Sequence, residues 1–218
     1  RKRLQGAVAH DLRNPIAIIQ GYAQYLLLNL SDNKISREKI SSAVSNILQT
    51  SHRLERYTDA LRTISRLEEL DVQVQTVNFA LLSSDMRKDL SLLTEERHLE
   101  LDWENTVSRK ELNLDAKILY RILENLISNA VRFANQKIKV HLSYDQGFLR
   151  VTVSDDGPGF SQKVLNSKDS YSCMNSDNED HLGLGLSICR ILCQKHGGQL
   201  TLSNADHGGA VIRFILLS

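Results

Sequence analysis

The chain has 218 residues, enough for one large domain or two small ones, and its 41% hydrophobic content can supply buried cores. Its 27 Lys and Arg residues nearly balance its 26 Asp and Glu residues, and the net charge of +1 excludes a global electrostatic attraction to nucleic acid or to an anionic membrane. We therefore expect local recognition sites and no nucleic-acid partner.

The cysteines and the hydropathy pattern indicate a cytoplasmic protein. Cys173, Cys189 and Cys193 are odd in number and lack the CxxC spacing of metal or redox sites, which favours inert thiols in a reducing compartment. No apolar run approaches the roughly 20 residues of a membrane-spanning helix. Because the chain begins with Arg1-Lys2-Arg3 inside an expected helix, we expect a fragment whose parent protein reaches the cell membrane only through upstream segments.

The first 70 residues have the heptad rhythm of helices in a bundle. One helix is expected from the start to about Leu30, and a second after Ser36, which can cap it. The apolar stripes consist of Leu12, Ile16, Ile19, Ala23, Leu26 and Leu30, and then of Ile40, Ala43, Val44, Ile47, Leu54, Leu61 and Ile64. Since a lone helical hairpin buries too little apolar surface, we predict a homodimer whose two hairpins form a four-helix bundle.

A second domain is expected at residues 71–218, where the period changes to two. Alternation at Val72, Val74 and Val77 predicts a strand near 72–78. Further strands are expected near 99–104, 110–114, 137–145, 148–155, 199–204 and 209–217, and helices near 81–97, 115–134 and 184–196. This irregular order predicts an α+β sandwich with helices on one face of the sheet. The segment at about 160–182 lacks periodicity and is expected to be a mobile lid or disordered.

His10 is the first candidate for a reactive group. It lies two residues before Leu12, roughly 200° around the helix from the packed stripe, so its ring is expected to face solvent. A neutral imidazole is a competent nucleophile near neutral pH, and Asp11 can accept the proton of the other ring nitrogen. Asn14, one turn on, can orient a water. Taken alone, an exposed His beside an Asp is more typical of a solvated surface pair.

Four side chains of the helix expected over 115–134 share one of its faces. They are Asn125, Asn129, Arg132 and Phe133. Amide oxygens suit Mg²⁺ in company with water and phosphate, although two asparagines four residues apart are more often plain surface residues.

Two glycine motifs follow in the second domain. The run Val153–Gly159 ends an expected strand with Asp155-Asp156-Gly157-Pro158-Gly159, in which the glycines permit a sharp turn. The run Gly183–Ser187 precedes a helix, where backbone N–H groups can meet phosphates. DxGxG is common in ordinary turns and a lone GxG is weak, so neither motif decides alone.

Together the four motifs resemble those of sensor histidine kinases of two-component systems. The run His10–Pro15 resembles the H-box, Glu124–Phe133 the N-box, Val153–Gly159 the G1 box and Gly183–Ser187 the G2 box. They occur in the family's order over nearly the whole chain. The resemblance implies that residues 1–70 dimerise and carry the phosphorylated histidine. It also implies that residues 71–218 have the Bergerat ATP-binding fold shared with the gyrase subunit, heat-shock chaperones and mismatch-repair ATPases.

The resemblance also implies a role for each residue of the nucleotide site, which would bind ATP and Mg²⁺. Asn129 would hold Mg²⁺, Asn125 would support the metal and phosphate site, and Arg132 would meet a phosphate. Phe133 would lie against the adenine, whose amino group would donate to Asp155. The backbone would approach the nucleotide at Gly157, Gly159, Gly183, Leu184 and Gly185.

The implied function is ATP-dependent autophosphorylation of His10, with Asp11 as the base, and transfer to an aspartate of a response-regulator receiver domain. Asn14 would support phosphatase activity, and the second domain would swing on a hinge near Glu68–Val72. His181 stands where the family often has a glycine, which leaves room for a non-enzymatic module that dimerises and docks a partner. An ATPase of the gyrase or chaperone kind is the other alternative, but it places a catalytic Glu where this chain has Asn125.

Overall fold

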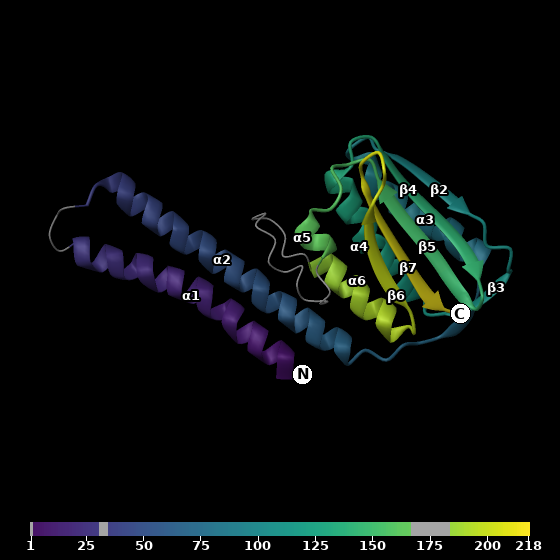
Figure 1. The fold of residues 1–218 in the computed structure, drawn as a ribbon, viewed down its shortest axis with the longest axis horizontal. Coiled ribbons are helices and arrows are strands. Elements are labelled where there is room, and N and C mark those ends of the chain that lie inside the picture. The colour runs from purple at the N-terminus through teal and green to yellow at the C-terminus, as the bar shows by residue number, and fades with distance from the viewer. Residues whose placement is uncertain (1, 31–34, 167–183) are drawn as a thin grey trace. The chain divides into compact units, whose positions relative to one another are not determined.

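The computed structural model describes residues 2–30, 35–166 and 184–218. Its contacts divide the chain into two compact units, Arg1–Ser65 and Arg66–Ser218 (Figure 1). The division falls inside a helix, slightly before the domain boundary at residue 70 that the sequence predicts, and that boundary stays a prediction.

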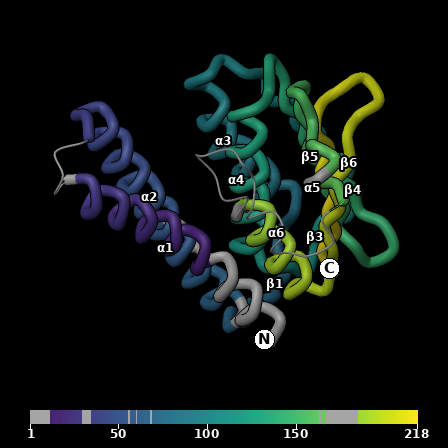
Figure 2. Tube along the Cα trace, turned by 60° about the vertical axis from the view of Figure 1, so that its left-hand side comes forward, coloured from purple at the N-terminus to yellow at the C-terminus, as the bar shows by residue number. Residues whose placement is uncertain are grey.

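The first unit is a helical hairpin, as predicted. Helix α1 (Lys2–Leu30) continues through Pro15, and α2 (Arg37–Glu68) runs beside it in both views (Figures 1 and 2). Ser36 caps α2 as expected, because its hydroxyl accepts from the backbone N–H of Lys39 at 3.4 Å. Of the predicted stripes, Ala43 and Ile64 are buried, whereas Ile16 is 41% and Val44 49% exposed.

The second unit contains two sheets. Strands β2 (Glu100–Asn105), β4 (Lys137–Asp145), β5 (Phe148–Asp155), β7 (Ala210–Leu217) and β6 (Gln199–Asn204) form a five-stranded sheet in that spatial order. Its pairs are antiparallel except for the parallel pair β2–β4. Strands β1 (Gln75–Asn78) and β3 (Glu111–Leu114) pair separately. The strand predicted near 72–78 is therefore wrong over 72–74, because β1 begins only at Gln75. Val74, which the alternation places on a buried face, is 54% exposed.

Three longer helices cover one face of the five-stranded sheet, as predicted (Figure 2). They are α3 (Phe79–Glu95), α4 (Ala116–Phe133) and α6 (Leu184–Lys195). On β4, Ile138, Val140 and Leu142 are buried, while the intervening Lys139 is exposed. This period of two places one strand face in the core and the other in solvent. The core thus lies between the sheet and the apolar side of α4.

Caps and turns fix the ends of these elements. Asp115 caps α4, and its Oδ1 accepts from the backbone N–H of Lys117 and Ile118. The β4–β5 hairpin turns at Gln146 and Gly147, which both have positive φ, as a two-residue turn between twisted strands requires. Helix α5 (Gln162–Leu165) is one turn within the segment predicted as a lid or disordered, whose residues 167–182 lie outside the described part.

Within the described ranges, no helix combines the length and the apolar character needed to cross a bilayer.

Candidate functional site

Three motifs that are far apart in the sequence meet around α4. A methyl group added at Gly185, on the first turn of α6, would lie 3.6 Å from Oδ1 of Asn125. A methyl group at Gly157 would collide with the carbonyl oxygen of Phe133, at the last residue of α4. The start of α6 and the loop after β5 therefore both approach α4 along the part that bears the predicted asparagines. Close approach of the loop to α4 requires glycine at position 157.

Asp155 holds the loop after β5 in a tight turn. Its Oδ1 accepts from the backbone N–H of Gly157 at 2.9 Å and from that of Ala210 at 3.3 Å. Its Oδ2 accepts no hydrogen bond from the residues that the structure describes. Since the side chain is only half-buried, this oxygen remains able to accept from a ligand. Asp155 thus presents a fixed carboxylate at the end of β5.

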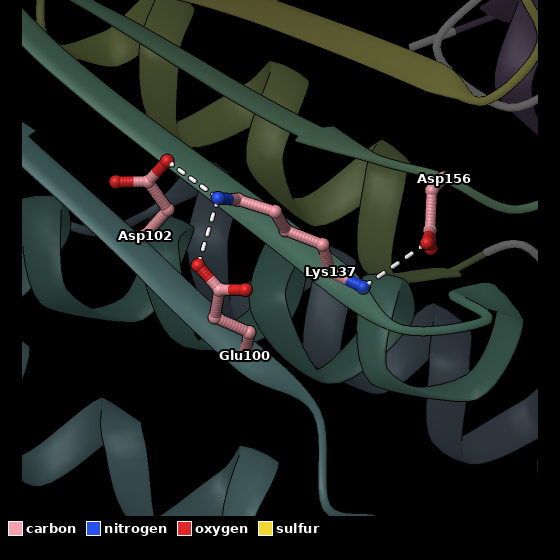
Figure 3. Close-up of polar contacts among 4 residues, drawn as sticks. All are labelled: Glu100, Asp102, Lys137 and Asp156. Atoms are coloured by element: carbon pink, nitrogen blue, oxygen red, sulfur yellow. Dashed lines mark hydrogen bonds and ion pairs between the residues drawn. The ribbon is translucent and has the colours of Figure 1, made fainter.

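Unlike Asp155, Asp156 binds the segment between α4 and β4, and it thereby ties the loop after β5 to that segment (Figure 3). Its carboxylate accepts from the backbone N–H groups of Asn135, Gln136 and Lys137 at 2.8 to 3.2 Å. Desolvation by the surrounding protein raises the pKa of Asp156, but these backbone N–H groups outweigh it and hold the pKa below its usual value of 3.8, although the residue is exposed. The charge of Asp156 is therefore used to fix the backbone.

Lys137 continues this cluster onto the edge strand β2 (Figure 3). Its Nζ lies 2.7 Å from Oε1 of Glu100 and 3.0 Å from Oδ2 of Asp102. The hydrogen bonds to Glu100 and then to Asp102 raise the pKa of Lys137. Because the two carboxylates are largely solvent-exposed, these pairs join β2 to β4 but add little stability.

Asn204, at the end of β6, holds the far side of the same loop. Its Oδ1 accepts from the backbone N–H of Phe160 at 2.7 Å, and its Nδ2 donates to the Phe160 carbonyl at 2.9 Å. Gly159 has a φ of +77° and passes so close to Asn204 that a methyl group there would lie 2.8 Å from Oδ1. The loop is thus anchored by Asp155, Asp156 and Asn204, which preorganises its backbone.

The predicted residues of α4 have different surroundings. Nδ2 of Asn125 donates to the carbonyl of Arg121 at 2.7 Å, which leaves its Oδ1 facing Gly185. Asn129 is half-exposed and makes no side-chain hydrogen bond to the described residues. The guanidinium of Arg132 lies 5.2 Å from the ring centre of Phe133, whose side chain is 41% exposed.

Helix α6 is fixed through its buried side. Cys189 and Cys193 are fully buried, and Sγ of Cys189 lies 3.7 Å from the carbonyl oxygen of Ile122 on α4. Burial raises the pKa of Cys193 to about 12 and that of Cys189 well above its usual value, so both thiols stay protonated near neutral pH. This agrees with the expectation of inert thiols. Cys173 lies outside the described residues.

Part of the predicted site also lies outside the described residues. His10 and Asp11 are in α1, but their side chains are not described, so the solvent-facing ring stays a prediction. Asn14, one turn on, is exposed. Gly183 is not described, and Leu184 is described only as the first residue of α6.

Sequence reasoning missed four residues that position the site. Two are the anchors Asp156 and Asn204. The others are Asp115 and His196: the backbone N–H of Asp115 donates to Nε2 of buried His196 at 2.8 Å, which joins the start of α4 to the end of α6. A cap residue before the long apolar helix was a readable signal for Asp115. Nothing in the local sequence reveals the partner of Asn204, because that contact spans 44 residues.

Comparisons with known proteins match both units. Residues 1–70 match the family model "His Kinase A (phospho-acceptor) domain". Residues 114–218 match "Histidine kinase-, DNA gyrase B-, and HSP90-like ATPase". The sensor histidine kinase SpaK of Bacillus subtilis is 28% identical over 219 residues, which cover 98% of this chain and 47% of SpaK. The chain thus spans less than half the length of this curated relative.

Solved structures of histidine kinases share the fold. The histidine kinase AdeS of Acinetobacter baumannii is 21% identical with a TM-score of 0.59, covering 95% of this chain and 97% of that one. The histidine kinase ThkA, solved in complex with the response regulator protein TrrA, is 22% identical with a TM-score of 0.64, covering 99% of this chain and 61% of ThkA. With its phospho-acceptor domain followed by an ATP-binding domain, the chain belongs to the sensor histidine kinases of two-component systems.

Proposed function

We propose that this chain binds ATP·Mg²⁺ around α4, the Asp155 loop and the start of α6, and transfers the γ-phosphoryl group to His10. The observation that carries the proposal is the meeting of Asn125 with Gly185 and of Phe133 with Gly157. These contacts bring amide oxygens, a helix N-terminus and a fixed carboxylate around one helix. Such groups complement a metal-bound triphosphate and a purine amino group.

The side chains present suit the purine and the phosphates. Oδ2 of Asp155 is free to accept from the adenine amino group while Oδ1 holds the turn. Phe133 is exposed enough to contact the base, and Arg132 beside it carries the charge to meet a phosphate. Gly183, Leu184 and Gly185 supply backbone N–H groups at the start of α6. Gly157 and Gly159 keep the loop backbone close to the base.

The metal is assigned to Asn129. Its amide makes no hydrogen bond to the described residues, and it lies one turn beyond Asn125 on α4. Mg²⁺ takes few protein oxygens and completes its shell with water and phosphates, so a single amide oxygen suits it. When bound, Mg²⁺ would neutralise charge that develops on the phosphates during transfer.

Catalysis by the chain's own residues would be mainly positioning. Asp11 would accept the proton from the non-attacking nitrogen of His10, which makes the other nitrogen the nucleophile for in-line attack on phosphorus. The ADP oxygen leaves as the N–P bond forms, giving a phosphohistidine. Asn14 is exposed and follows His10 by one helical turn in the sequence. It is assigned to orienting water in the dephosphorylation reaction.

We further assign two partners. The phosphoryl group would pass to an aspartate of a response-regulator receiver domain; the relative ThkA has been solved in complex with the response regulator TrrA. A second copy of the chain would pair with the hairpin, which leaves Ile16, Val44 and Leu48 between 41% and 56% exposed. Membrane attachment is assigned to parts of the parent protein outside this chain.

Incubation with γ-³²P-labelled ATP and Mg²⁺ tests the assignment to His10. We expect an acid-labile, alkali-stable label that disappears in His10→Gln, because glutamine has no nucleophilic nitrogen. His52→Gln is the matched control, since His52 is an exposed histidine of the same hairpin. Full labelling of His10→Gln would refute the assignment. Nucleotide binding without any label would favour the non-enzymatic module, and steady ATP hydrolysis by His10→Gln would favour the gyrase-like alternative.

A further inference from the structure

The segment that joins α2 to β1 is attached to the catalytic unit at two points. Nζ of Lys195, the last residue of α6, donates to the carbonyl oxygen of Leu70 at 2.9 Å. The backbone N–H of Gln73 donates to Oδ2 of Asp115 at 2.8 Å. Both attachments lie within the unit Arg66–Ser218. Leu70 lies within the hinge that the sequence predicts, Glu68–Val72, and Gln73 lies directly after it.

The attachment at Asp115 is firm. Asp115 is 5% exposed, and its Oδ1 is already engaged by the first turn of α4. Its own N–H donates to His196, which is 4% exposed. A carboxylate held by backbone groups on both oxygens keeps its orientation, so Gln73 is fixed to the start of α4.

The attachment at Lys195 is the weaker one. It is a single, solvent-exposed hydrogen bond from an ammonium on a flexible side chain, so opening it costs little. When it opens, Leu70 keeps the hydrogen bond from its N–H to the carbonyl oxygen of Leu67, and Asp71 and Val72 make no hydrogen bond to the described residues before the anchored Gln73. Each residue released regains backbone freedom, which enlarges the range of arrangements that the catalytic unit can sample.

The same two helices carry the linker attachments and the nucleotide motifs at opposite ends. Helix α6 starts with Gly185 against Asn125 and ends with Lys195 on the linker. Helix α4 is capped by Asp115, which holds the linker, and reaches Asn125 ten residues later, about 15 Å along its axis. A substitution of Lys195 therefore changes the linker end of α6 and leaves the residues at its nucleotide end in place.

We propose that Lys195 is a positioning residue for phosphorylation of His10: by holding the carbonyl of Leu70 it confines the hinge to the end of α2 and keeps the catalytic unit in orientations that reach the histidine. This inference rests on the proposed function. Phosphoryl transfer depends mainly on orientation, so a longer free linker lowers the fraction of time spent in the reactive arrangement. Lys195 acts through the linker and does not touch the nucleotide.

The test compares Lys195→Met with Lys195→Arg in the 218-residue chain. At saturating ATP, Lys195→Met should label His10 about three- to tenfold more slowly, the loss expected for one hydrogen bond, with the ATP dissociation constant unchanged. Lys195→Arg should restore most of the rate, because arginine can also donate to the Leu70 carbonyl. Lys139→Met, an exposed lysine on the outer face of the sheet, should behave as wild type.

Hydrogen exchange separates failure of this inference from failure of the proposed function. Peptides that cover residues 69–74 should exchange faster in Lys195→Met than in the wild type, while the urea midpoint of unfolding stays the same. This readout needs no kinase activity, so absence of label in the wild type would contradict only the proposed function. Unchanged exchange of the linker, or a labelling rate equal to or above that of the wild type, would overturn the role of Lys195.

Discussion

At the scale of single residues, two adjacent aspartates at the end of β5 serve different purposes. Asp155 keeps one oxygen for the turn and leaves the other without a partner among the described residues. Asp156 uses its carboxylate on three backbone N–H groups of the α4–β4 connection. The pair therefore allows ligand binding and loop anchoring to be tested separately.

Asp155→Asn should weaken ATP binding about tenfold or more. The amide oxygen can keep the bonds to Gly157 and Ala210, but the amide nitrogen then faces the adenine amino group, and two donors meet without an acceptor. Isothermal titration with ATP and Mg²⁺ measures the change. Asp156→Asn is the matched control and should bind ATP within about threefold of wild type; equal losses in both variants would contradict the assignment to Asp155.

Asp156 should contribute to stability in a pH-dependent way. Because its pKa is lower in the folded chain than the usual 3.8, its contribution is fully present above that value and is lost as pH falls through the lower, folded pKa. At pH 7, Asp156→Asn should lower the free energy of unfolding, measured with urea, by about 1 kcal/mol. Below pH 4, the stability of this variant should decline less steeply with falling pH than that of the wild type. An acid decline as steep as that of the wild type would show that Asp156 does not carry this dependence.

At the scale of elements, α4 and α6 organise the catalytic unit. Helix α4 packs Ile118, Leu119, Ile122, Leu123, Leu126 and Ile127 into the core, and α6 packs its cysteines beside it. The polar residues proposed to bind the nucleotide lie on the remaining surface of α4. Position and chemistry are thus provided by adjoining faces of one amphipathic helix, since Asn125 and Asn129 are only partly exposed and border its buried side.

Gly185→Ala separates helix stability from nucleotide binding. Among the described residues, a methyl group at this position would meet only Asn125 Oδ1, at an ordinary 3.6 Å, so the fold should tolerate it. Alanine in a helix is favoured over glycine by about 1 kcal/mol, so thermal unfolding should occur at an equal or higher temperature. ATP affinity should still fall severalfold, because the backbone of the first turn would no longer be open to the phosphates. Unchanged affinity would place the phosphates away from α6.

How far the sequence predicted these elements depended on their patterning. Strands β4, β5 and β6 have the predicted bounds, since their alternation reflects one buried face. Residues 72–74 alternate as well, but they lie outside any strand. This part of the chain is held by two other hydrogen bonds, from the N–H of Gln73 to Asp115 and from Lys195 to the carbonyl of Leu70. The parallel pairing of β2 with β4 and the contact of Asn204 with Phe160 depend on distant segments, which no local pattern encodes.

The candidate site followed from motifs more than from patterning. Asn125, Gly157 and Gly185 were predicted from their motifs, and the structure brings their segments together. The roles of Asn129, Arg132 and Phe133 stay predictions, because they concern a ligand. Asp156 was present in the same motif as Asp155, but its bonds to the α4–β4 connection depend on the folded backbone.

At the scale of the whole molecule, the hairpin is expected to pair with that of a second copy. Leu48→Asp should dissociate the dimer, because a charge would replace a leucine that is 56% exposed in the single chain. Light scattering at micromolar concentration should then give the monomer mass. Leu92→Asp, which alters a leucine of α3 that is 60% exposed, is the control and should remain dimeric. A wild-type chain that is monomeric in this assay would contradict the four-helix bundle.

The central claim is that one chain carries both the nucleotide site and the histidine that receives the phosphoryl group. Tandem mass spectrometry at neutral to alkaline pH, after a short incubation with ATP and Mg²⁺, tests it most directly. The account predicts one phosphorylated peptide with the added mass on the ring of His10, absent when Asp155→Asn removes nucleotide binding at the ATP concentration used. A phosphoryl group found on another residue, or none on His10 despite bound ATP, would contradict it.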